Sequence, residues 1–247
     1  MFYCCGLTEK GLPEINEDSY LINRMVLSRA QMESDIRPPF VVAVADGVGG
    51  ENGGEVASRM ALEALAAYKP TAKQPIEKKI HEIHRMVREE GLKKGLANMQ
   101  TTLAAIIADE NGRFFAVNVG DSRIYRYRFG ELTQLSKDQS LVQLLYDHGK
   151  ISLEEKLTHK DRNLIFPAIG HLREDPSPYI AEIKGGIKSG DLMIICSDGV
   201  SDHISVGDFE EILSWPMRLS RRLRHLIGSA ADNGSPDNMT AVGLFLR

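Results

Sequence analysis

A short apolar run that ends abruptly at an acidic residue constrains the fold of this chain more than any other feature. Val41-Val-Ala-Val-Ala45 contains only small or β-branched residues, and Asp46-Gly47-Val48-Gly49-Gly50 follows it directly. The run predicts a buried strand, and a strand that places a carboxylate in a glycine-rich turn presents a ligand for a hard cation. Strands also commonly leave a sheet through an Asp-Gly turn for reasons of turn chemistry alone. One such turn therefore does not establish a site.

Three further apolar runs end or begin at an acidic residue in the same way. The first stops at Gly120-Asp121, and the second stops at Ser197-Asp198-Gly199. Asp237 stands just before the third run, which closes the chain. The adjacent carboxylates Glu17 and Asp18 precede a fifth run, and neighbouring side chains of a strand point to opposite faces. At most one of that pair therefore faces a given site through the pleat of the strand.

We expect the ends of these strands to bring six carboxylates together: Glu17, Asp18, Asp46, Asp121, Asp198 and Asp237. So many negative charges at one edge of a sheet repel one another unless cations neutralise them. A set of oxygen ligands without histidine or cysteine favours magnesium or manganese over zinc. Two such ions about 4 Å apart can activate a shared water and orient a phosphoryl group. The residues by themselves leave a nuclease and a calcium-binding module as alternatives.

The rest of the chain predicts a mixture of strands and helices without an internal repeat or a linker, so one domain, 1–247, is expected. Apolar spacing and alternation predict helices at about 54–68, 76–99 and 217–231, and a strand meander over 101–135. Residues 28–39 are polar, end in two prolines and are expected to form a surface loop. The irregular stretch 138–178 interrupts the sheet pattern and is a candidate binding segment.

Two histidines on the second predicted helix offer a different metal site. His81 and His84 are three residues apart, a spacing that could hold an ion. No third ligand stands nearby, and both lie on or near the polar side of the helix, so a solvent-exposed face is the preferred interpretation. The arginines of the helix at 217–231 are interpreted as a solvated face as well.

Composition and charge exclude several classes of protein. Across 247 residues the net charge is −4 and no basic stripe appears, which argues against a nucleic-acid interface. Cys4, Cys5 and Cys196 form no disulfide framework and fit reduced thiols of a cytoplasmic protein. The chain shows no signal peptide, and no uncharged apolar run approaches the length that spans a bilayer. We expect a soluble, cytoplasmic monomer that binds neither nucleic acid nor membrane.

Five short motifs stand in a fixed order along the chain. They are Asn16-Glu17-Asp18, Asp46-Gly47-Val48-Gly49-Gly50, Gly120-Asp121-Ser122-Arg123, Ser197-Asp198-Gly199 and Asp237-Asn238-Met239-Thr240. In order and spacing they resemble the metal-dependent protein serine/threonine phosphatases of the type 2C class, bacterial branch, over essentially the whole chain. The resemblance implies an α+β fold, a four-layer α-β-β-α sandwich in which helices flank two central antiparallel β-sheets. It also implies a metal cleft at one end of the sandwich.

The same resemblance implies roles for the acidic residues. Asp46 would bridge two manganese or magnesium ions and, with Asp198, would act on the substrate through a metal-activated water. Asp198 and Asp237 would hold the first ion. Glu17 and the backbone carbonyl of Gly47 would hold the second ion.

Further roles follow from the resemblance outside this pair of ions. Asp121, with Asp198 or Asp202, resembles the ligands of a third ion seen in bacterial members. Asp18 would orient the waters bound to the ions without touching the ions itself. Residues 138–178 resemble the flap that shapes substrate access.

Three positions depart from the family pattern. The family usually carries a phosphate-binding arginine four residues before the glutamate of the first motif, where this chain has Pro13 and then Glu14. Lys10 is the nearest basic residue on that loop. Val48 stands where many eukaryotic members have a histidine as a candidate general acid, and Gln139 stands where the flap often has histidine. The absence of an arginine at position 13 weakens phosphate binding without removing the metal chemistry.

The resemblance implies a phosphatase of phosphoserine and phosphothreonine in proteins that opposes a bacterial serine/threonine kinase. Two alternatives follow from Pro13: a pseudo-phosphatase that acts as a regulatory binding module, and a phosphatase of small phosphorylated metabolites. All the acidic metal positions remain, and a decaying site usually loses those first, so catalysis is the preferred interpretation. Lys10, Arg162 and Arg173 are the candidates to replace the missing arginine.

Overall fold

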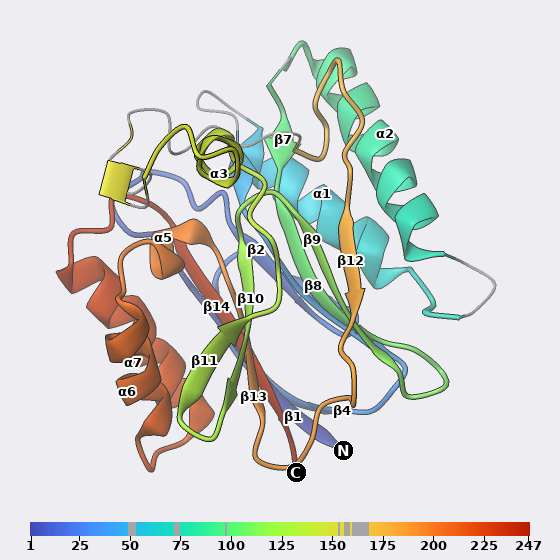
Figure 1. The fold of residues 1–247 in the computed structure, drawn as a ribbon. Coiled ribbons are helices and arrows are strands. Elements are labelled where there is room, and N and C mark those ends of the chain that lie inside the picture. Colours follow the sequence, from blue (N-terminus) through green and yellow to red (C-terminus); the bar gives the residue numbers. More distant parts are fainter. Residues whose placement is uncertain (49–52, 72–74, 97, 153, 156–158, 160–167) are drawn as a thin grey trace.

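Two antiparallel sheets packed face to face form the centre of the molecule, and helices cover both outer faces (Figure 1). This computed structural model describes residues 1–247 with the exception of 49–52, 72–74, 97, 153, 156–158 and 160–167. The expected four-layer α-β-β-α sandwich of the α+β class is thereby confirmed. In the part of the chain that the structure describes, no helix combines the length and the apolar character needed to cross a membrane.

Each sheet contains six strands. The first has the order β11 (Glu131–Gln134), β10 (Arg123–Arg128), β13 (Leu192–Cys196), β14 (Met239–Leu246), β1 (Phe2–Glu9) and β4 (Ala30–Ile36). The second has the order β12 (Tyr179–Glu182), β9 (Phe114–Val119), β8 (Leu103–Ala108), β5 (Phe40–Ala45), β2 (Ser19–Ile22) and β3 (Met25–Leu27). A short pair, β6 (Gly47–Val48) and β7 (Gln100–Thr101), follows the end of β5. The strands that lead into Asp46 and Asp198 are therefore interior strands of the two sheets.

The continuous apolar run of β5 reflects burial on both of its faces. Val42 and Val44 belong to the core between the two sheets. Val41, Ala43 and Ala45 belong to a second core under the helices. A strand that is buried on both faces reads as an unbroken apolar run and not as an alternating pattern. The apolar sequence of β5 therefore matches an environment in which both faces of the strand are buried.

Two pairs of helices form the outer layers. On the second sheet lie α1 (Gly54–Ala66) and α2 (Ile76–Lys94), and on the first lie α6 (Val206–Ser214) and α7 (Leu219–Asp232) (Figure 1). The three helices expected from apolar spacing are confirmed. The second ends at Lys94 and not at about Met99, because Gly95 adopts a left-handed conformation (φ 71°) that terminates it.

The surface loop expected at 28–39 is wrong in its central part. Ala30–Ile36 form β4, which pairs with β1 from Thr8 to Phe2 at the edge of the first sheet. Its side chains alternate between half-buried and exposed over most of its length. An edge strand with one solvent-facing side can be largely polar, and polar edges discourage pairing with other chains. The sequence of β4 therefore lacks an apolar run because this strand lies at the edge of the sheet.

The interpretation of His84 as part of a solvent-exposed helix face is also wrong. The side chain is fully buried, and its Nδ1 accepts a hydrogen bond of 3.1 Å from the backbone N–H of Gly170. Its Nε2 lies 3.2 Å from Oδ1 of Asp175. His84 thus joins α2 to the chain beyond it, at a place where the helix periodicity puts a polar residue next to the apolar stripe.

Candidate metal centre

Strand pairing brings acidic residues from distant parts of the chain to one end of the sandwich. Ser19 of β2 pairs with Ala45 of β5 in antiparallel register, so Asp18 and Asp46 are neighbours across the two strands. In the facing sheet, β13 and β14 pair in the same antiparallel sense. The end of one strand and the beginning of its partner therefore share an edge in both sheets.

Asp46 lies at the centre of the acidic cluster. Burial raises the pKa of its carboxyl well above the ordinary value, and the charges of four neighbours raise it further, in the order Asp18, Asp198, Asp237 and Asp121. Five of the six predicted carboxylates are thus close enough to act on one another. The structure brings these residues together as the strand-end pattern predicts.

Asp198 is the first residue of α5 (Asp198–Ser201), directly after β13. Burial raises the pKa of its carboxyl to about 6, and the charges of Asp237 and Asp202 act in the same direction. A side-chain hydrogen bond with Asp46 opposes this shift. The carboxyls of Asp46 and Asp198 therefore lie next to each other, where both could face a cation.

Asp18 is fully buried, and a hydrogen-bond network holds one of its two carboxylate oxygens. The hydroxyl of Ser197 donates to Oδ2 of Asp18 at 2.7 Å, and the backbone N–H of Thr240 donates to that hydroxyl at 3.0 Å. Burial raises the pKa of Asp18 to about 7, while hydrogen bonds from Thr240 and Ser197 lower it in part. The network joins the start of β2 to the ends of β13 and β14.

Among the described residues, three buried carboxylate oxygens lack a hydrogen-bond donor: Oδ1 of Asp18, Oδ1 of Asp121 and Oδ1 of Asp198. A buried polar atom without a partner is costly, and a cation supplies such a partner. The donor set, oxygen throughout, suits magnesium or manganese. Among the described residues, no group of three or more His, Cys, Asp or Glu side chains is already arranged to hold an ion. The residues fit an ion by chemistry and proximity, and carboxylate rotation is needed to complete a ligand shell.

Close backbone contacts at two glycines position Glu17. Its carboxylate accepts a hydrogen bond from the N–H of Gly54, which lowers its pKa against the larger, opposite effect of burial. A Cβ added at Gly54 would lie 2.7 Å from Oε1 of Glu17, and one at Gly47 would overlap the backbone of Gly54. Side chains at these positions would push Glu17 away. Gly47 and Gly54 therefore let the backbone and the Glu17 carboxylate approach each other closely, in addition to any role in a turn.

Hydroxyl groups that the sequence analysis did not assign hold the backbone of Asp46. The N–H of Asp46 donates to Oγ1 of Thr102 at 3.0 Å, and the hydroxyl of Thr101 donates to the carbonyl of Asp46 at 2.8 Å. Oγ1 of Thr102 also lies 2.7 Å from Oγ of Ser122. The paired threonines were visible at the start of an apolar run. Threonine is common in strands for packing reasons, so their role could not be separated from strand propensity.

Asp202 lies at the margin of the cluster and is engaged by an arginine. Its Oδ1 is 2.8 Å from Nη1 of Arg123, whose Nη2 is 2.8 Å from Oδ2 of Asp138. Burial is the main cause that raises the pKa of Asp121 well above its ordinary value, and the charges of Asp198 and Asp202 raise it further. Asp202 therefore lies close to Asp121 and shares the guanidinium of Arg123 with Asp138.

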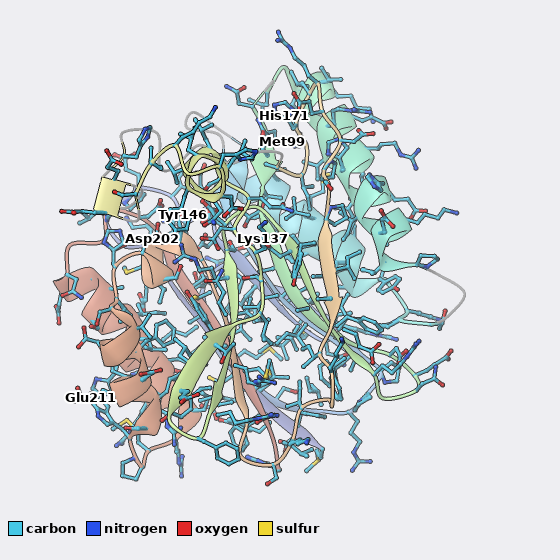
Figure 2. All side chains as sticks on the ribbon, viewed as in Figure 1. Met99, Lys137, Tyr146, His171, Asp202 and Glu211 are labelled. Carbon is cyan, nitrogen blue, oxygen red and sulfur yellow. The ribbon has the colours of Figure 1, made fainter. Side chains whose placement is uncertain are left out.

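Gln139 connects the loop before Asp121 to the far end of the segment 138–178. Its Oε1 accepts from the N–H of Gly120 at 3.0 Å, and its Nε2 donates to the carbonyl of Ser177 at 2.8 Å. The segment contains α3 (Leu141–Asp147). In the view of Figure 2, Tyr146 of α3 and Asp202 lie in the upper half of the molecule, and Glu211 of α6 lies in the lower half.

The candidates to replace the missing arginine differ in position. Lys10 is anchored near the cluster, because its carbonyl accepts a hydrogen bond of 2.6 Å from Nδ2 of Asn238. Its side chain borders a cavity of about 840 Å³. Arg173 is exposed. Arg162 lies outside the described residues, as do Gly49-Gly50 of the glycine-rich motif.

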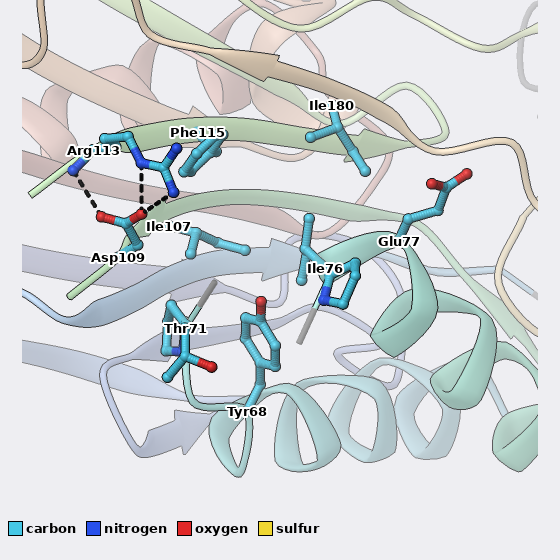
Figure 3. A pocket seen from close by; sticks show the side chains of 11 residues that line it. Tyr68, Thr71, Ile76, Glu77, Ile107, Asp109, Arg113, Phe115 and Ile180 are labelled. Atoms are coloured by element: carbon cyan, nitrogen blue, oxygen red, sulfur yellow. Dashed lines mark hydrogen bonds and ion pairs between the residues drawn. The ribbon is translucent and has the colours of Figure 1, made fainter. Parts of the chain in front are cut away.

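An apolar cavity of about 300 Å³ lies apart from the acidic cluster (Figure 3). Tyr68, Phe115 and Ile180 contribute to its walls, and an ion pair between Asp109 and Arg113 closes one side at 2.7 Å. Asp109 follows β8 at the end opposite to the threonines that hold Asp46, roughly 20 Å away along the strand. This cavity is not part of the candidate metal centre.

Comparison with known sequences identifies relatives of the chain. The family model described as protein phosphatase 2C matches residues 31–239. The serine/threonine protein phosphatase PstP of Mycobacterium tuberculosis is 36% identical over 210 residues, which cover 82% of this chain and 39% of that protein. The chain therefore spans about two fifths of the length of this relative. The serine/threonine phosphatase stp of Listeria monocytogenes is 32% identical, with 82% of both chains covered.

Solved structures extend the similarity to the fold. The crystal structure of Mycobacterium tuberculosis PstP/Ppp superimposes with a TM-score of 0.82 at 32% identity over 100% of both chains. The catalytic domain of PstP in complex with two manganese ions superimposes with a TM-score of 0.77 at 31% identity over 99% of both chains. Both similarities cover the two sheets and the helices on either side of them.

Proposed function

The chain belongs to the protein phosphatase 2C family, and on that premise we propose that it hydrolyses phosphoserine and phosphothreonine in proteins with divalent manganese or magnesium ions. The observation that carries this proposal is the buried cluster of carboxylates around Asp46, three of whose members have an oxygen with no hydrogen-bond partner in the described part of the chain. In the reaction, the phosphorus–oxygen bond to serine or threonine breaks and a bond to a water oxygen forms. The water gives up a proton, and the leaving oxygen takes one.

The proposed ligands follow the family pattern and the observed proximity. Asp46, Asp198 and Asp237 would hold the first ion, and Asp46, Glu17 and the carbonyl of Gly47 would hold the second. When bound, such a pair of ions supplies Lewis acidity toward a water and a phosphoryl oxygen. The protein supplies the buried setting that strengthens these electrostatic interactions. Support comes from the charges that surround Asp46 and from the placement of Glu17 against Gly54.

Two further assignments depend on partners in the structure. Asp121 and Asp198 are the preferred ligands of a third ion, because Asp202 is already paired with Arg123. Asp18 does not contact an ion in this proposal. Its carboxylate, held by Ser197, orients waters at the ions from behind.

We propose phosphoproteins as substrates and a serine/threonine kinase as the enzyme that produces them. Hydrolysis of a phosphate ester on serine or threonine reverses the product of such a kinase. A cytoplasmic location and a monomeric state are proposed as well. The three cysteines, all buried free thiols, are consistent with a reducing compartment.

Hydrolysis of a phosphothreonine peptide tests the function. With manganese, the wild type should turn over the peptide, and EDTA should abolish turnover. Asp198→Asn should lower kcat by at least about a hundredfold, because it removes a charge that holds the ion. Asp35→Asn, which breaks an exposed ion pair with Arg247, serves as the matched control and should retain activity. Metal-independent turnover, or full activity in Asp198→Asn, would contradict the proposal.

Pro13 is the observation that favours the two alternatives, a pseudo-phosphatase and a phosphatase of small metabolites. Neither Pro13 nor Glu14 offers a cation for phosphate. Turnover of the phosphopeptide, p-nitrophenyl phosphate and metabolite esters should be compared under the same metal conditions. Metal binding without any turnover would support the pseudo-phosphatase. A preference for metabolite esters over the peptide would support the third function.

A further inference from the structure

A cavity borders the acidic cluster on the side of Glu17. It measures about 840 Å³ and lies between the end of β1, the connection from β3 to β4 and the first turns of α1. Asn16 forms part of its wall, where Nδ2 donates to Oγ1 of Thr8 at 2.8 Å and to the carbonyl of Ser28 at 3.1 Å. Since Glu17 is the next residue, the cavity begins one residue away from a proposed metal ligand.

The lining of this cavity carries charges of both signs, with cations in the majority. Lys10, Arg29 and Arg59 contribute three cations, and Glu9 and Glu55 contribute two carboxylates. Oε2 of Glu55 accepts a hydrogen bond of 3.2 Å from the N–H of residue 53, so this carboxylate is directed at the start of α1. The cations outnumber the carboxylates by one, three against two, although the whole chain has a net charge of −4. Because the Glu55 carboxylate already accepts a hydrogen bond at the start of α1, the three cations suit an anionic ligand.

The three cations are available to such a ligand. Lys10 and Arg29 form no ion pair within the described residues. Nε of Arg59 lies 3.9 Å from Oε1 of Glu63, with both side chains more than half exposed. A loose and exposed pair of this kind holds a guanidinium only weakly. Arginine and lysine side chains can therefore turn toward an anion in the cavity without breaking a buried contact.

We propose that the cavity bounded by Lys10, Arg29 and Arg59 receives an anionic side chain of a phosphoprotein substrate close to its phosphorylated serine or threonine. This inference rests on the proposed function and adds a determinant of substrate choice. Leu12 and Ile15, 78% and 49% exposed, lie on the loop between the cavity and Glu17 and contact the intervening peptide.

The anion is either the carboxylate of aspartate or glutamate or a second phosphate. Both carry the charge and the acceptor oxygens that arginine binds well. In either case the cavity supplies substrate binding energy that Pro13 does not. The arms of the experiment below distinguish the two sources.

The experiment measures kcat and KM with manganese for three phosphothreonine peptides, whose flanking residues are neutral, glutamate or phosphoserine. The wild type should show a KM about three- to tenfold lower for at least one anionic peptide than for the neutral one. In the double variant Arg29→Gln/Arg59→Gln this ratio should fall to about one. The matched control is Arg24→Gln/Arg85→Gln, which removes two exposed arginines outside the cavity and should keep the ratio.

The outcomes separate this proposal from the proposed function. Equal KM values for all three peptides in the wild type, or an unchanged ratio in the double variant, would overturn the cavity proposal. A lower KM for the phosphoserine peptide alone assigns the cavity to a second phosphate. If no substrate is turned over, the proposed function fails, and an NMR titration with an unphosphorylated glutamate peptide decides on the cavity. Amide shifts at residues 10, 29 and 59 that vanish in the double variant support it, and their absence refutes it.

Discussion

At the scale of single residues, the acidic cluster depends on glycines as much as on acids. The carboxylate of Glu17 lies over the backbone of Gly54 and accepts its N–H, and Gly47 contacts the backbone of Gly54 from the other side. Neither glycine requires a left-handed conformation here, since neither has a positive φ. The absence of a side chain is what lets a strand end, a loop and a helix start meet.

Replacement of Gly54 by alanine tests this contact. The added Cβ displaces the carboxylate of Glu17, so manganese affinity should fall by about tenfold, as it does when a supporting contact of a ligand is lost. Isothermal titration with manganese measures the change. Gly228→Ala is the control, because nothing lies within 4 Å of the added atom. It should leave the affinity unchanged and stabilise α7 by about 0.5–1 kcal/mol. Equal affinity in both variants would refute the contact.

The raised pKa values of buried acids predict how the metal-free protein responds to pH. Burial raises the pKa of Asp18 to about 7 and that of Asp198 to about 6. The folded state therefore retains protons that the unfolded chain releases near pH 4. This contribution to stability is fully present below about pH 4 and is lost as the pH rises through about 6 and 7.

Thermal unfolding in EDTA measures this effect. The midpoint should fall between about pH 5 and about pH 8, and Asp18→Asn should flatten the dependence because it removes one titrating group. Manganese should raise the midpoint more at about pH 8, where protons no longer compete for the ligands. A midpoint that rises steadily over this range would contradict the assignment.

At the scale of secondary structure, His84 shows how one side chain ties two elements together. It projects from α2 and accepts the N–H of Gly170, which has φ 92° and packs against Met99 and Val87. Burial lowers the pKa of His84, with the charge of Arg88 acting in the same direction. The neutral ring is therefore the form that accepts this bond. Gly170 belongs to the segment 138–178 that resembles a flap, so the contact ties the later part of that segment to α2.

The variant His84→Ala should destabilise the protein by about 2–4 kcal/mol, because it opens a cavity and leaves the buried N–H of Gly170 without a partner. Urea unfolding measures the change in the free energy of unfolding. His81→Ala, only half-buried on the same helix, should remain within about 0.5 kcal/mol of the wild type. If the two variants behave alike, the His84 contact does not stabilise the fold.

At the scale of the whole molecule, the sandwich makes separate unfolding of its layers unfavourable. The core between the sheets contains residues of both, such as Val44 and Ile195. The acidic cluster is also built from both sheets, since Asp46 follows β5 and Asp198 follows β13. Removal of either sheet would expose the core face of the other and dismantle the site.

Metal-free unfolding in urea should therefore be a single cooperative transition. Trp215, the only tryptophan of the chain, follows α6 on the side of the first sheet. Far-ultraviolet circular dichroism reports on both sheets and all helices. Coincident midpoints and slopes from the two signals are expected for one unit. An earlier transition of Trp215 fluorescence would instead indicate two independent units.

Particular elements show why prediction from sequence succeeded in some places and failed in others. The strand at 40–45 was predicted because both of its faces are buried, which leaves an unbroken apolar run. β4 was missed because an edge strand needs no such run. His84 was misplaced because helix periodicity gives the direction of a side chain and not the segment that covers it. Thr101 and Thr102 looked like ordinary strand residues, although they hold Asp46.

The sequence by itself determined the main helices, the buried strands that lead to acidic residues, the oxygen-only set of these residues and the family that the order of motifs indicates. These depend on local periodicity and on residue chemistry, which a linear chain displays directly. Tertiary structure decided how the carboxylates are arranged around Asp46, that Arg123 pairs with Asp202, and that Lys10, Arg29 and Arg59 line one cavity. Such contacts join residues far apart in the chain. Strand register and close backbone approach create them, and the local sequence does not specify which distant residues will be partners.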